Sequence, residues 1–265
     1  MTSVDLQYRV HYDAVCTDSN RRIVCWFSCG AASAAAAYLI LKKRRKNVVV
    51  VYCDTLSDEH TDNARFLLEV QDWLGVSVLR EKSEKYADRW DVYEKTRYLV
   101  GVKGAQCTVA LKKVVRNKFA LPGDINVFGY TSEERIRIER LLSSGSEVNA
   151  CFPLDDLSIK KGETLALLQS AKIELPAMYQ LRYRNNNCLG CVKGGQGYWN
   201  KIRKDFPQQF DRMARMERDL GVAINKKESD GRQVRTRTRL FLDELDPLAG
   251  RYKSEPDISC GVLCQ

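Results

Sequence analysis

Two cysteines separated by two residues, Cys188 and Cys191, have the spacing in this chain that is best suited to chemistry. A Cys-x-x-Cys turn directs two thiolates at one centre, where they bind a metal or act as a redox-active dithiol. The chain has 10 cysteines but only 2 histidines, and no second pair has this spacing, so a zinc ribbon fits poorly. The spacing alone leaves a metal centre, a redox dithiol and an inert pair open.

The turn at residues 28–33, with the sequence Ser-Cys-Gly-Ala-Ala-Ser, is a second candidate site. An apolar segment at residues 23–27 leads into it, and an alanine-rich helix is expected at residues 33–41. A strand, a small turn and a helix start present backbone N–H groups to an anion, and the helix dipole adds to the attraction. Ser28 and Ser33 add hydroxyl donors. The turn is not a Walker loop, and an ordinary closely packed strand and helix is the alternative.

The elements that must position these residues are alternating strands and helices. Apolar segments predict strands at residues 23–27, 48–52, 76–79 and 125–128. Helices are predicted at residues 33–41, 58–74, 84–99, 107–121, 131–142 and 158–172. This alternation predicts an α/β fold with a doubly wound, mostly parallel sheet. Ser28, Asp54 and Gly129 each follow a predicted strand, so they are expected to share the crevice at the carboxyl ends of the strands.

The composition changes after residue 176, which predicts two parts. Residues 1–180 are expected to form a nucleotide-binding α/β domain, and residues 181–265 a C-terminal helical extension or lid that carries the Cys-x-x-Cys turn and a terminal cysteine. Two helices separated at Pro207 are predicted in the extension. Residues 225–239 are polar and basic and are expected to be mobile. Cys25 and Cys53 lie within apolar strand patterns and are expected to be buried.

The chain has 265 residues, a hydrophobic content of 44% and a net charge of +9. This charge predicts an anionic partner such as a nucleotide, a sulfate ester or a nucleic acid, with an unspecific basic surface as the alternative. No segment is apolar enough to cross a membrane and the N-terminus has no signal-peptide pattern, so we expect a cytoplasmic protein without a membrane partner. Cysteines in that compartment favour metal ligation or thiol catalysis over disulfides.

The 28–33 turn resembles the pyrophosphate loop of the adenine-nucleotide α-hydrolase superfamily, which reads Ser-Gly-Gly-x-Asp-Ser. Two positions depart from that pattern, because Cys29 replaces a glycine and Ala32 replaces the aspartate. Members that adenylate a substrate with ATP and magnesium keep the aspartate. The resemblance therefore implies nucleotide binding at Ser28, Gly30 and Ser33 and disfavours activation by ATP.

Most of the chain resembles the phosphoadenosine-phosphosulfate and adenosine-phosphosulfate reductase family. Cys53-Asp54-Thr55 resembles the Asp-Thr pair at a strand end that contacts adenosine in that family, largely through backbone atoms. Gly129-Tyr130-Thr131-Ser132-Glu133-Glu134 resembles its Gly-x-Arg-x-x-Glu motif, with Thr131 in place of the arginine. The resemblance places Asp54, Thr55 and Gly129 in the nucleotide site. The threonine at position 131 removes one anion contact that the arginine would provide.

The same resemblance implies a 4Fe–4S cluster. Family members with a cluster carry Cys-Cys-x-x-Arg-Lys and a later Cys-x-x-Cys. Here Cys107 and Lys112 match the first motif, with a threonine in place of the second cysteine, and Cys188 and Cys191 match the later pair. Three ligands therefore carry over. Cys264 is the leading candidate for the fourth, with Cys151, a non-cysteine ligand or an open iron as alternatives.

Ser259-Cys260-Gly261-Val262-Leu263 resembles the C-terminal Glu-Cys-Gly-Leu-His of the same family, with Ser259 and Leu263 as departures. There the cysteine attacks the sulfonyl sulfur and expels the nucleotide, and thioredoxin or glutaredoxin then releases sulfite. The resemblance implies Cys260 as the nucleophile and a sulfonucleotide as the substrate. The chemistry needs a thiolate, for which the basic 225–239 segment would supply the field. As an alternative to a place in the cluster, Cys264 would serve as an internal resolving thiol for Cys260.

Two other functions remain open from the sequence. One is a sulfur transferase acting on nucleic acid, for tRNA or DNA thiolation, which the positive charge and a three-cysteine cluster with an open iron would suit. The absence of the loop aspartate argues against it. The other is a non-catalytic nucleotide-binding protein, because the changes at Ala32 and Thr131 leave room for lost activity.

Overall fold

The computed structural model describes residues 8–18, 20–101, 104–143, 149–228, 237–256 and 258. The chain divides into two compact units. Unit 1 comprises Met1–Leu56, His60–Lys82 and Lys113–Asn186, and unit 2 comprises Ser57–Glu59, Ser83–Lys112 and Asn187–Gln265. Unit 1 ends close to the domain boundary predicted at residue 180, while residues 83–112, which the sequence placed in the first domain, belong to unit 2.

Unit 1 is built on a five-stranded sheet in which every neighbouring pair of strands is parallel. The strand order is β3-β2-β1-β6-β7. The strands are β1 (Ile23–Phe27), β2 (Val48–Cys53), β3 (Val78–Glu81), β6 (Ile125–Val127) and β7 (Ala150–Cys151). The predicted α/β fold with a mostly parallel sheet is confirmed. Every residue of β1 is buried, which explains its uninterrupted apolar sequence in the middle of the sheet.

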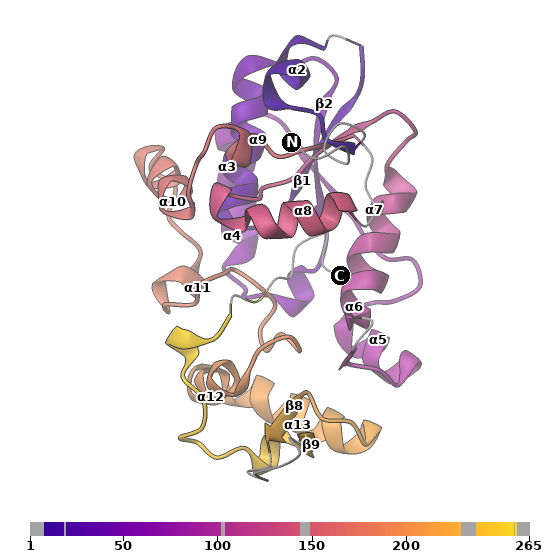
Figure 1. Ribbon diagram of the computed structural model, residues 1–265, viewed down its shortest axis with the longest axis vertical. Helices are drawn as coiled ribbons and strands as arrows, with labels where there is room; N and C mark the ends of the chain where they lie inside the picture. Colours follow the sequence, from indigo (N-terminus) through magenta and orange to yellow (C-terminus); the bar gives the residue numbers. More distant parts are fainter. Residues whose placement is uncertain are drawn as a thin grey trace. The chain divides into compact units, whose positions relative to one another are not determined.

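Helices flank this sheet, with α3 and α7 on opposite sides of it (Figure 1). The helices of unit 1 are α2 (Tyr12–Thr17), α3 (Ala31–Lys43), α4 (Asn63–Leu74), α7 (Val114–Phe119), α8 (Arg135–Ser143), α9 (Pro153–Asp156), α10 (Lys161–Ser170) and α11 (Ala177–Gln180). α4 begins later than predicted, because a 3₁₀ turn at Leu56–Asp58 precedes it. A capping box is present, with Thr131 and Glu134 bonded to each other's backbone at the 3₁₀ turn Ser132–Glu134 before α8.

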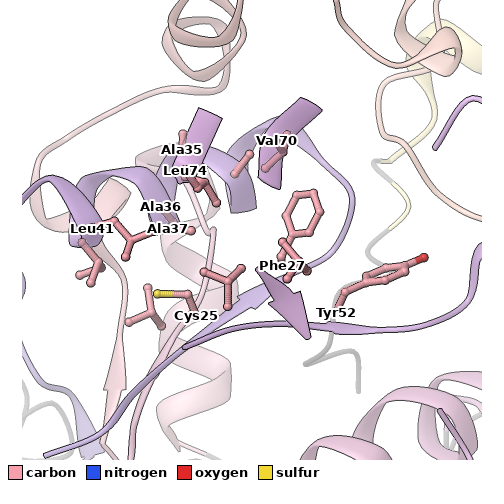
Figure 2. Close-up of a cluster of buried hydrophobic side chains, with 14 of the residues drawn as sticks. Cys25, Phe27, Ala35, Ala36, Ala37, Leu41, Tyr52, Val70 and Leu74 are labelled. Carbon is pink, nitrogen blue, oxygen red and sulfur yellow. The ribbon is translucent and has the colours of Figure 1, made fainter. Parts of the chain in front are cut away.

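The core of unit 1 lies between α3, α4 and the sheet (Figure 2). The alanines at positions 34–37 of α3 are all buried, and their small side chains let the helix lie close to the strands. Phe27 points toward Val70 of α4, and the ring of Tyr52, from the neighbouring strand, lies 6.2 Å from the ring of Phe27. Cys25 is buried in the same cluster and Cys53 is buried in β2, as the sequence predicted. This packing fixes α3, and therefore the 28–33 turn, against the end of β1.

The chain changes direction in the sheet at β1. β2 and then β3 extend the sheet on one side of β1, and the chain later crosses over to add β6 and β7 on the other side. In open α/β sheets this switch point opens a crevice at the carboxyl ends of the strands. Ser28 follows β1, Asp54 follows β2, and Gly129 lies just beyond β6. The sheet therefore brings the three predicted residues to one edge.

Unit 2 is mainly helical. It contains α5 (Arg89–Thr96), α6 (Gln106–Thr108), α12 (Gln196–Asp205) and α13 (Pro207–Leu220). A π-helical turn at Val109–Lys113 follows α6 and leads into α7 of unit 1. Its 3₁₀ turns are Leu242–Glu244 and Tyr252–Ser254, and β4 (Val100–Gly101) pairs with β5 (Gly104–Ala105). α13 begins at Pro207, where the sequence predicted the break between two helices.

The basic segment 225–239 is more ordered at its ends than the sequence predicted. β8 (Asn225–Glu228) and β9 (Arg237–Leu240) pair as antiparallel strands, and the residues between them lie outside the described part. The expectation of a mobile segment is therefore wrong for the two ends, because a polar, positively charged sequence forms a hairpin here. Within the described residues, no helix is long and apolar enough to cross a bilayer.

Candidate functional site

The two predicted hydroxyls of the 28–33 loop lie together. Ser33 Oγ accepts the backbone N–H of Ser28 at 3.0 Å and donates to the carbonyl oxygen of Gly30 at 2.9 Å. Ser28 Oγ lies 3.1 Å from Ser33 Oγ. Gly30 is the N-cap of α3 and provides no side-chain cap, so the first turn of the helix keeps backbone N–H groups for an external acceptor. This is the geometry that binds phosphate and sulfate at helix N-termini.

Cys29 has a backbone conformation that favours glycine, the residue at this position in the resembling loop. Its φ is 57°, in the left-handed region, which costs a residue with a Cβ atom about 1–2 kcal/mol. Asn186 Nδ2 donates to the carbonyl oxygen of Cys29 at 2.6 Å and to Asn63 Oδ1 at 2.7 Å. The thiol of Cys29 is buried, 3.6 Å from the carbonyl oxygen of Asn63. These contacts hold the turn in a conformation that is otherwise unfavourable.

Tyr179 of α11 faces the same turn. A Cβ atom placed on Gly30 would lie 3.6 Å from Tyr179 Oη and 3.8 Å from Ser28 Oγ. Burial raises the pKa of Tyr179 to about 12, and the backbone N–H groups of Ala31 and Asn186, which face its oxygen, act in the opposite direction. A neutral hydroxyl therefore lies next to the first N–H group of α3.

Gly129 brings the end of β6 onto this turn. A Cβ atom at Gly129 would lie 2.5 Å from Ser33 Cα and 2.6 Å from Ser33 N, so no other residue fits without moving backbone. Gly129 therefore contributes close packing between the end of β6 and the first turn of α3.

The side chain of Asp54 is buried and is paired with two cationic side chains. Its carboxylate accepts two hydrogen bonds from Arg80, at 2.9 and 2.6 Å, and lies 3.5 Å from Lys82 Nζ. Both cations are exposed, whereas the Asp54 side chain is only 2% exposed. Thr55 is buried next to Tyr52, whose hydroxyl receives its backbone N–H at 3.3 Å. Two cationic groups therefore lie next to the carboxyl end of β2.

Thr131, at the position of the arginine in the resemblance, is buried and engaged in the capping box. Arg137, on the helix that follows, has its guanidinium 4.5 Å from the ring centroid of Tyr130 and pairs with Glu134. The threonine thus has a structural role at the helix start, and it supplies no cation to the crevice.

In unit 2, the three predicted cysteines lie around two buried tyrosines. Tyr93 Oη donates to Cys107 Sγ at 3.4 Å. Burial raises the pKa of Tyr93 well above its usual range, and the thiolates of Cys107 and Cys191 add to this. Burial likewise raises the pKa of Tyr198, with further contributions from Cys191 and Cys188. Each tyrosine therefore lies near two of the three cysteines.

The Cys-x-x-Cys turn is held by Tyr198 and Arg89. Tyr198 Oη accepts the backbone N–H of Cys191 at 2.9 Å and donates to the carbonyl oxygen of Cys188 at 3.3 Å. Arg89 donates to the carbonyl oxygens of Gly190, at 3.0 Å, and of Leu189. The backbone of the turn is thereby fixed from both sides.

Arg89 also carries a buried positive charge to this turn. Its side chain is 3% exposed, and Arg89 Nε lies 3.5 Å from Asp58 Oδ1, an ion pair in which neither atom has a hydrogen-bond partner among the described residues. Burial lowers the pKa of Arg89, but nearby Tyr93, Cys188 and Asp58 outweigh it and raise the pKa. A guanidinium in this position stabilises thiolates.

The predicted metal site is not closed by the residues that the structure describes. Thiolates suit iron, yet no three described side chains of His, Cys, Asp or Glu lie close enough together to hold a metal ion. Cys260 and Cys264 lie outside the described residues. Cys151 is a core residue of β7, where burial raises the pKa of its thiol well above the usual range, so it is poorly suited to ligate iron.

The structure of this chain is similar to solved structures. The crystal structure of phosphoadenylyl-sulfate (PAPS) reductase from Candida auris, a phosphate complex, matches with a TM-score of 0.50 and 13% identity, over 66% of this chain and 84% of that chain. This chain has the fold of the phosphoadenylyl-sulfate reductases. The U34-tRNA thiolase NcsA from Methanococcus maripaludis, with its [4Fe-4S] cluster, matches with a TM-score of 0.38 and 14% identity, over 77% of this chain and 73% of that chain. No family model and no curated protein matches the sequence.

Within this reductase-like fold, several residues at the two sites were not predicted from the sequence. Around the 28–33 loop they are Asn63, Tyr179 and Asn186, and around the cysteines they are Asp58, Arg89, Tyr93 and Tyr198. Most of them reach their site through tertiary contacts from a distant part of the chain, whereas Tyr198 comes from the helix that follows the Cys-x-x-Cys turn. The one local signal is the run of asparagines at residues 185–187, which directly precedes Cys188.

Proposed function

We propose that this chain is an enzyme of the sulfonucleotide reductase type, which binds an adenine nucleotide at the 28–33 loop. The observation that carries the proposal is the loop itself. Ser28, Ser33 and the uncapped start of α3 converge at the switch point of the sheet, with Gly129 packed against them. Arg80 and Lys82 add positive charge at the neighbouring strand end. These groups suit the phosphates of a nucleotide.

The reaction that we propose has two steps. The thiolate of Cys260 attacks the sulfonyl sulfur, the bond between that sulfur and the phosphate oxygen breaks, and the nucleotide leaves with both electrons of the bond. A thiol of thioredoxin or glutaredoxin then attacks Cys260 Sγ, which releases sulfite and leaves a mixed disulfide. A second thiol of the reductant resolves that disulfide. The nucleophile is restored, and the reductant is oxidised by two electrons.

We also propose that Cys107, Cys188 and Cys191 hold an iron–sulfur cluster, with Cys264 as the fourth ligand. Support comes from the three thiols, from the cationic Arg89, and from the two tyrosines in unit 2 that hydrogen-bond to the cysteines. Because the described residues alone do not close a metal site, neither step of the reaction depends on the cluster.

The test is sulfite release under anaerobic conditions. The protein is incubated with phosphoadenosine phosphosulfate or adenosine phosphosulfate and a dithiol, and sulfite is measured for the wild type, Cys260→Ser and the control Cys16→Ser. Cys16 lies in α2 of unit 1 and is outside the proposed chemistry. Sulfite from the wild type and Cys16→Ser, but not from Cys260→Ser, would support the proposal. Equal turnover by Cys260→Ser would contradict it.

The alternative of an ATP-dependent sulfur transferase acting on tRNA or DNA is tested with the same proteins. Ala32 has a methyl group where the adenylating enzymes of the superfamily that the loop resembles have a carboxylate. The loop therefore lacks a carboxylate that would bind the magnesium ion of a magnesium–ATP complex. AMP formation from ATP in the presence of RNA, without sulfite from either sulfonucleotide, would favour the transferase. Nucleotide binding without either reaction would favour a non-catalytic binding protein.

A further inference from the structure

A hydroxyl group from a distant part of unit 1 borders the open face of the 28–33 loop. A Cβ atom on Gly30 would meet Tyr179 Oη at 3.6 Å and Ser28 Oγ at 3.8 Å, which are ordinary contact distances. Gly30 is the N-cap of α3, so the space beside it leads to the N–H groups of the first helical turn. The hydroxyls of Tyr179 and Ser28 therefore flank the space that an anion at this helix start would enter.

Tyr179 is held firmly in this place. Its ring packs against the hydrophobic core of unit 1. At the start of α11, the backbone N–H of Ala177 donates to Asp62 Oδ2 at 2.8 Å, and Asp62 is paired with Arg65 of α4. After the end of α11, the backbone N–H of Arg182 donates to the carbonyl oxygen of Tyr179 at 2.9 Å. Packing and contacts at both ends of this short helix thus fix the hydroxyl at the loop.

The oxygen of Tyr179 acts as a hydrogen-bond acceptor. It accepts the backbone N–H of Ala31, the first residue of α3, and the backbone N–H of Asn186. A phenolic hydroxyl both accepts and donates, and because both N–H groups point at the oxygen, its proton has to point away from them. Hydrogen bonds in a chain polarise one another, so a hydroxyl that accepts is also a stronger donor. Tyr179 therefore extends the positive end of the helix dipole to the group that accepts its proton.

Asn186 holds this hydroxyl and the loop at the same time. Its backbone N–H bonds the oxygen of Tyr179, while its side-chain Nδ2 donates to the carbonyl oxygen of Cys29 at 2.6 Å. Cys29 directly precedes Gly30. The position of the hydroxyl relative to the loop is therefore set before any ligand binds, and such preorganisation lowers the entropic cost of binding.

The protons of the two loop serines have acceptors within the loop. Ser33 Oγ donates to the carbonyl oxygen of Gly30 at 2.9 Å, and Ser28 Oγ lies 3.1 Å from Ser33 Oγ, which can accept its proton. No hydrogen bond joins Tyr179 Oη to either serine, although all three side chains belong to the described part of the chain. Of the three hydroxyls, that of Tyr179 is the one best placed to donate to an external acceptor.

We propose that the Tyr179 hydroxyl is a phosphate-binding donor, which completes the anion site formed by Ser28, Ser33 and the start of α3. Its proton bonds a non-bridging oxygen of a phosphate group. That this phosphate belongs to an adenine nucleotide rests on the proposed function. The competing role for Tyr179 is that of a plug, whose oxygen occupies the N–H group of Ala31 and keeps an anion away from it. The two roles predict opposite effects when the hydroxyl is removed.

Tyr179→Phe removes the hydroxyl and keeps the ring. Calorimetric titration measures the affinity for AMP, for inorganic phosphate and for adenosine, which has no phosphate. We expect the affinity for AMP and for phosphate to fall at least about tenfold, because a hydrogen bond to a charged acceptor is lost, while the affinity for adenosine stays the same. Tyr38→Phe is the matched control in α3, where its ring stacks on Trp73 at 4.4 Å, and it should bind like the wild type. Unchanged or tighter binding of AMP by Tyr179→Phe would overturn the proposal.

A second variant covers the case in which Tyr179→Phe does not fold, since phenylalanine leaves two N–H groups without their acceptor. Difluorotyrosine at position 179 keeps the oxygen and both of these bonds, but its hydroxyl ionises closer to neutral pH. Between pH 7 and 9 the phosphate of AMP stays doubly ionised, and the wild-type Tyr179, with a pKa raised by burial to about 12, stays protonated. AMP affinity should therefore fall across this range only in the fluorinated protein. Parallel pH profiles for the two proteins would overturn the donor role.

The sulfite assay separates this inference from the proposed function. Loss of phosphate and AMP affinity in Tyr179→Phe, together with a wild type that releases no sulfite from either sulfonucleotide, would support the role of Tyr179 and contradict the reductase. Sulfite release by the wild type, with unchanged affinities in Tyr179→Phe, would overturn the role of Tyr179 alone. A wild type that binds neither AMP nor inorganic phosphate would overturn both.

Discussion

The side-chain amide of Asn186 donates a hydrogen bond of 2.6 Å to the carbonyl oxygen of Cys29, at the one position of the 28–33 loop whose φ is positive. The same amide nitrogen donates to Asn63 Oδ1 at 2.7 Å, while Asn186 Oδ1 is buried without a hydrogen-bond partner among the described residues. The orientation of this amide is therefore set by two acceptors. Asn186 is the last residue of unit 1, and its side chain therefore ties the end of that unit to the loop that we propose binds phosphate.

This relationship predicts different effects for two substitutions of Asn186. Asn186→Ala should lower the stability of the protein by about 1–3 kcal/mol, because two buried acceptors lose their donor. Asn186→Asp should cost more, because a carboxylate cannot donate and would face two oxygens. It should also weaken nucleotide binding more than alanine does, since it adds negative charge beside the loop. Thermal unfolding and calorimetric titration with an adenine nucleotide measure both effects. Equal values for the two variants would contradict the orientation of the amide.

Two glycines beside the loop should behave differently when they are replaced. A Cβ atom at Gly30 would meet only ordinary contacts, and its φ of −119° suits a β-branched residue, so Gly30→Val should fold with a change in stability below about 1 kcal/mol. It should nevertheless weaken nucleotide binding at least tenfold, because the side chain fills the approach to the helix start.

Gly129→Ala is the contrasting variant. Its Cβ atom would lie 2.5 Å from Ser33 Cα, so backbone must move and stability should fall by about 3 kcal/mol. Urea unfolding and calorimetry on both variants check the pair. A Gly30→Val protein that is folded and retains full nucleotide affinity would place the nucleotide elsewhere.

Much of the fold could be predicted from the sequence because the central strands are buried on both faces. Residues 23–27 and 48–52 are uninterrupted apolar runs, and the structure confirms both as strands. β7 could not be predicted in this way, because it has only two residues and no period of its own. The hairpin of β8 and β9 was also missed, since its stability does not come from an apolar pattern but from pairing between two charged segments.

The candidate site shows the same limit. Ser28 and Ser33 could be predicted because they share one turn, and their contact at 3.1 Å follows from that turn. The sequence predicted only that Gly129 lies near the loop. That a side chain at Gly129 would clash with Ser33 depends on the pairing of β1 with β6, which the sequence does not show. Tyr179 approaches the loop from a distant helix, so a sequence without a structure gives no reason to single it out.

The cysteines of unit 2 predict an iron content. We expect protein purified without oxygen to be brown and to contain about four irons per chain, in keeping with a 4Fe–4S cluster. Cys188→Ala should lose colour and iron, whereas Cys16→Ala, in unit 1, should keep both. Iron analysis and visible absorption measure this. A colourless wild type with one zinc per chain, from an iron-replete anaerobic preparation, would contradict the cluster.

Glu217 of α13 predicts a pH dependence of stability that is separate from the proposed reaction. Its side chain is fully buried, with Oε1 accepting the backbone N–H of Ile224 and Oε2 that of Leu242, both at 2.6 Å. Burial raises the pKa of Glu217 to about 7, and the two backbone N–H groups oppose this rise without cancelling it. Glu217 thus ties α13 to the segments on either side of the hairpin while titrating near neutrality.

The sign of the effect follows from proton binding. Between pH 4.5 and about 7 the carboxyl group is protonated in the folded protein and ionised in the unfolded chain, so the folded state binds the additional proton. The contribution of Glu217 to the free energy of unfolding should therefore fall by about 3 kcal/mol as the pH rises through this range, and level off above it.

Glu217→Gln isolates this contribution, because an amide does not titrate. We expect the variant to be less stable than the wild type at pH 5, since one backbone N–H loses its acceptor, and the difference between the two proteins should shrink toward pH 7. Urea unfolding at half-unit steps of pH measures the difference, with Glu94→Gln as the exposed control that should follow the wild type. A difference between wild type and Glu217→Gln that is constant from pH 5 to 8 would show that the pKa of Glu217 is not raised.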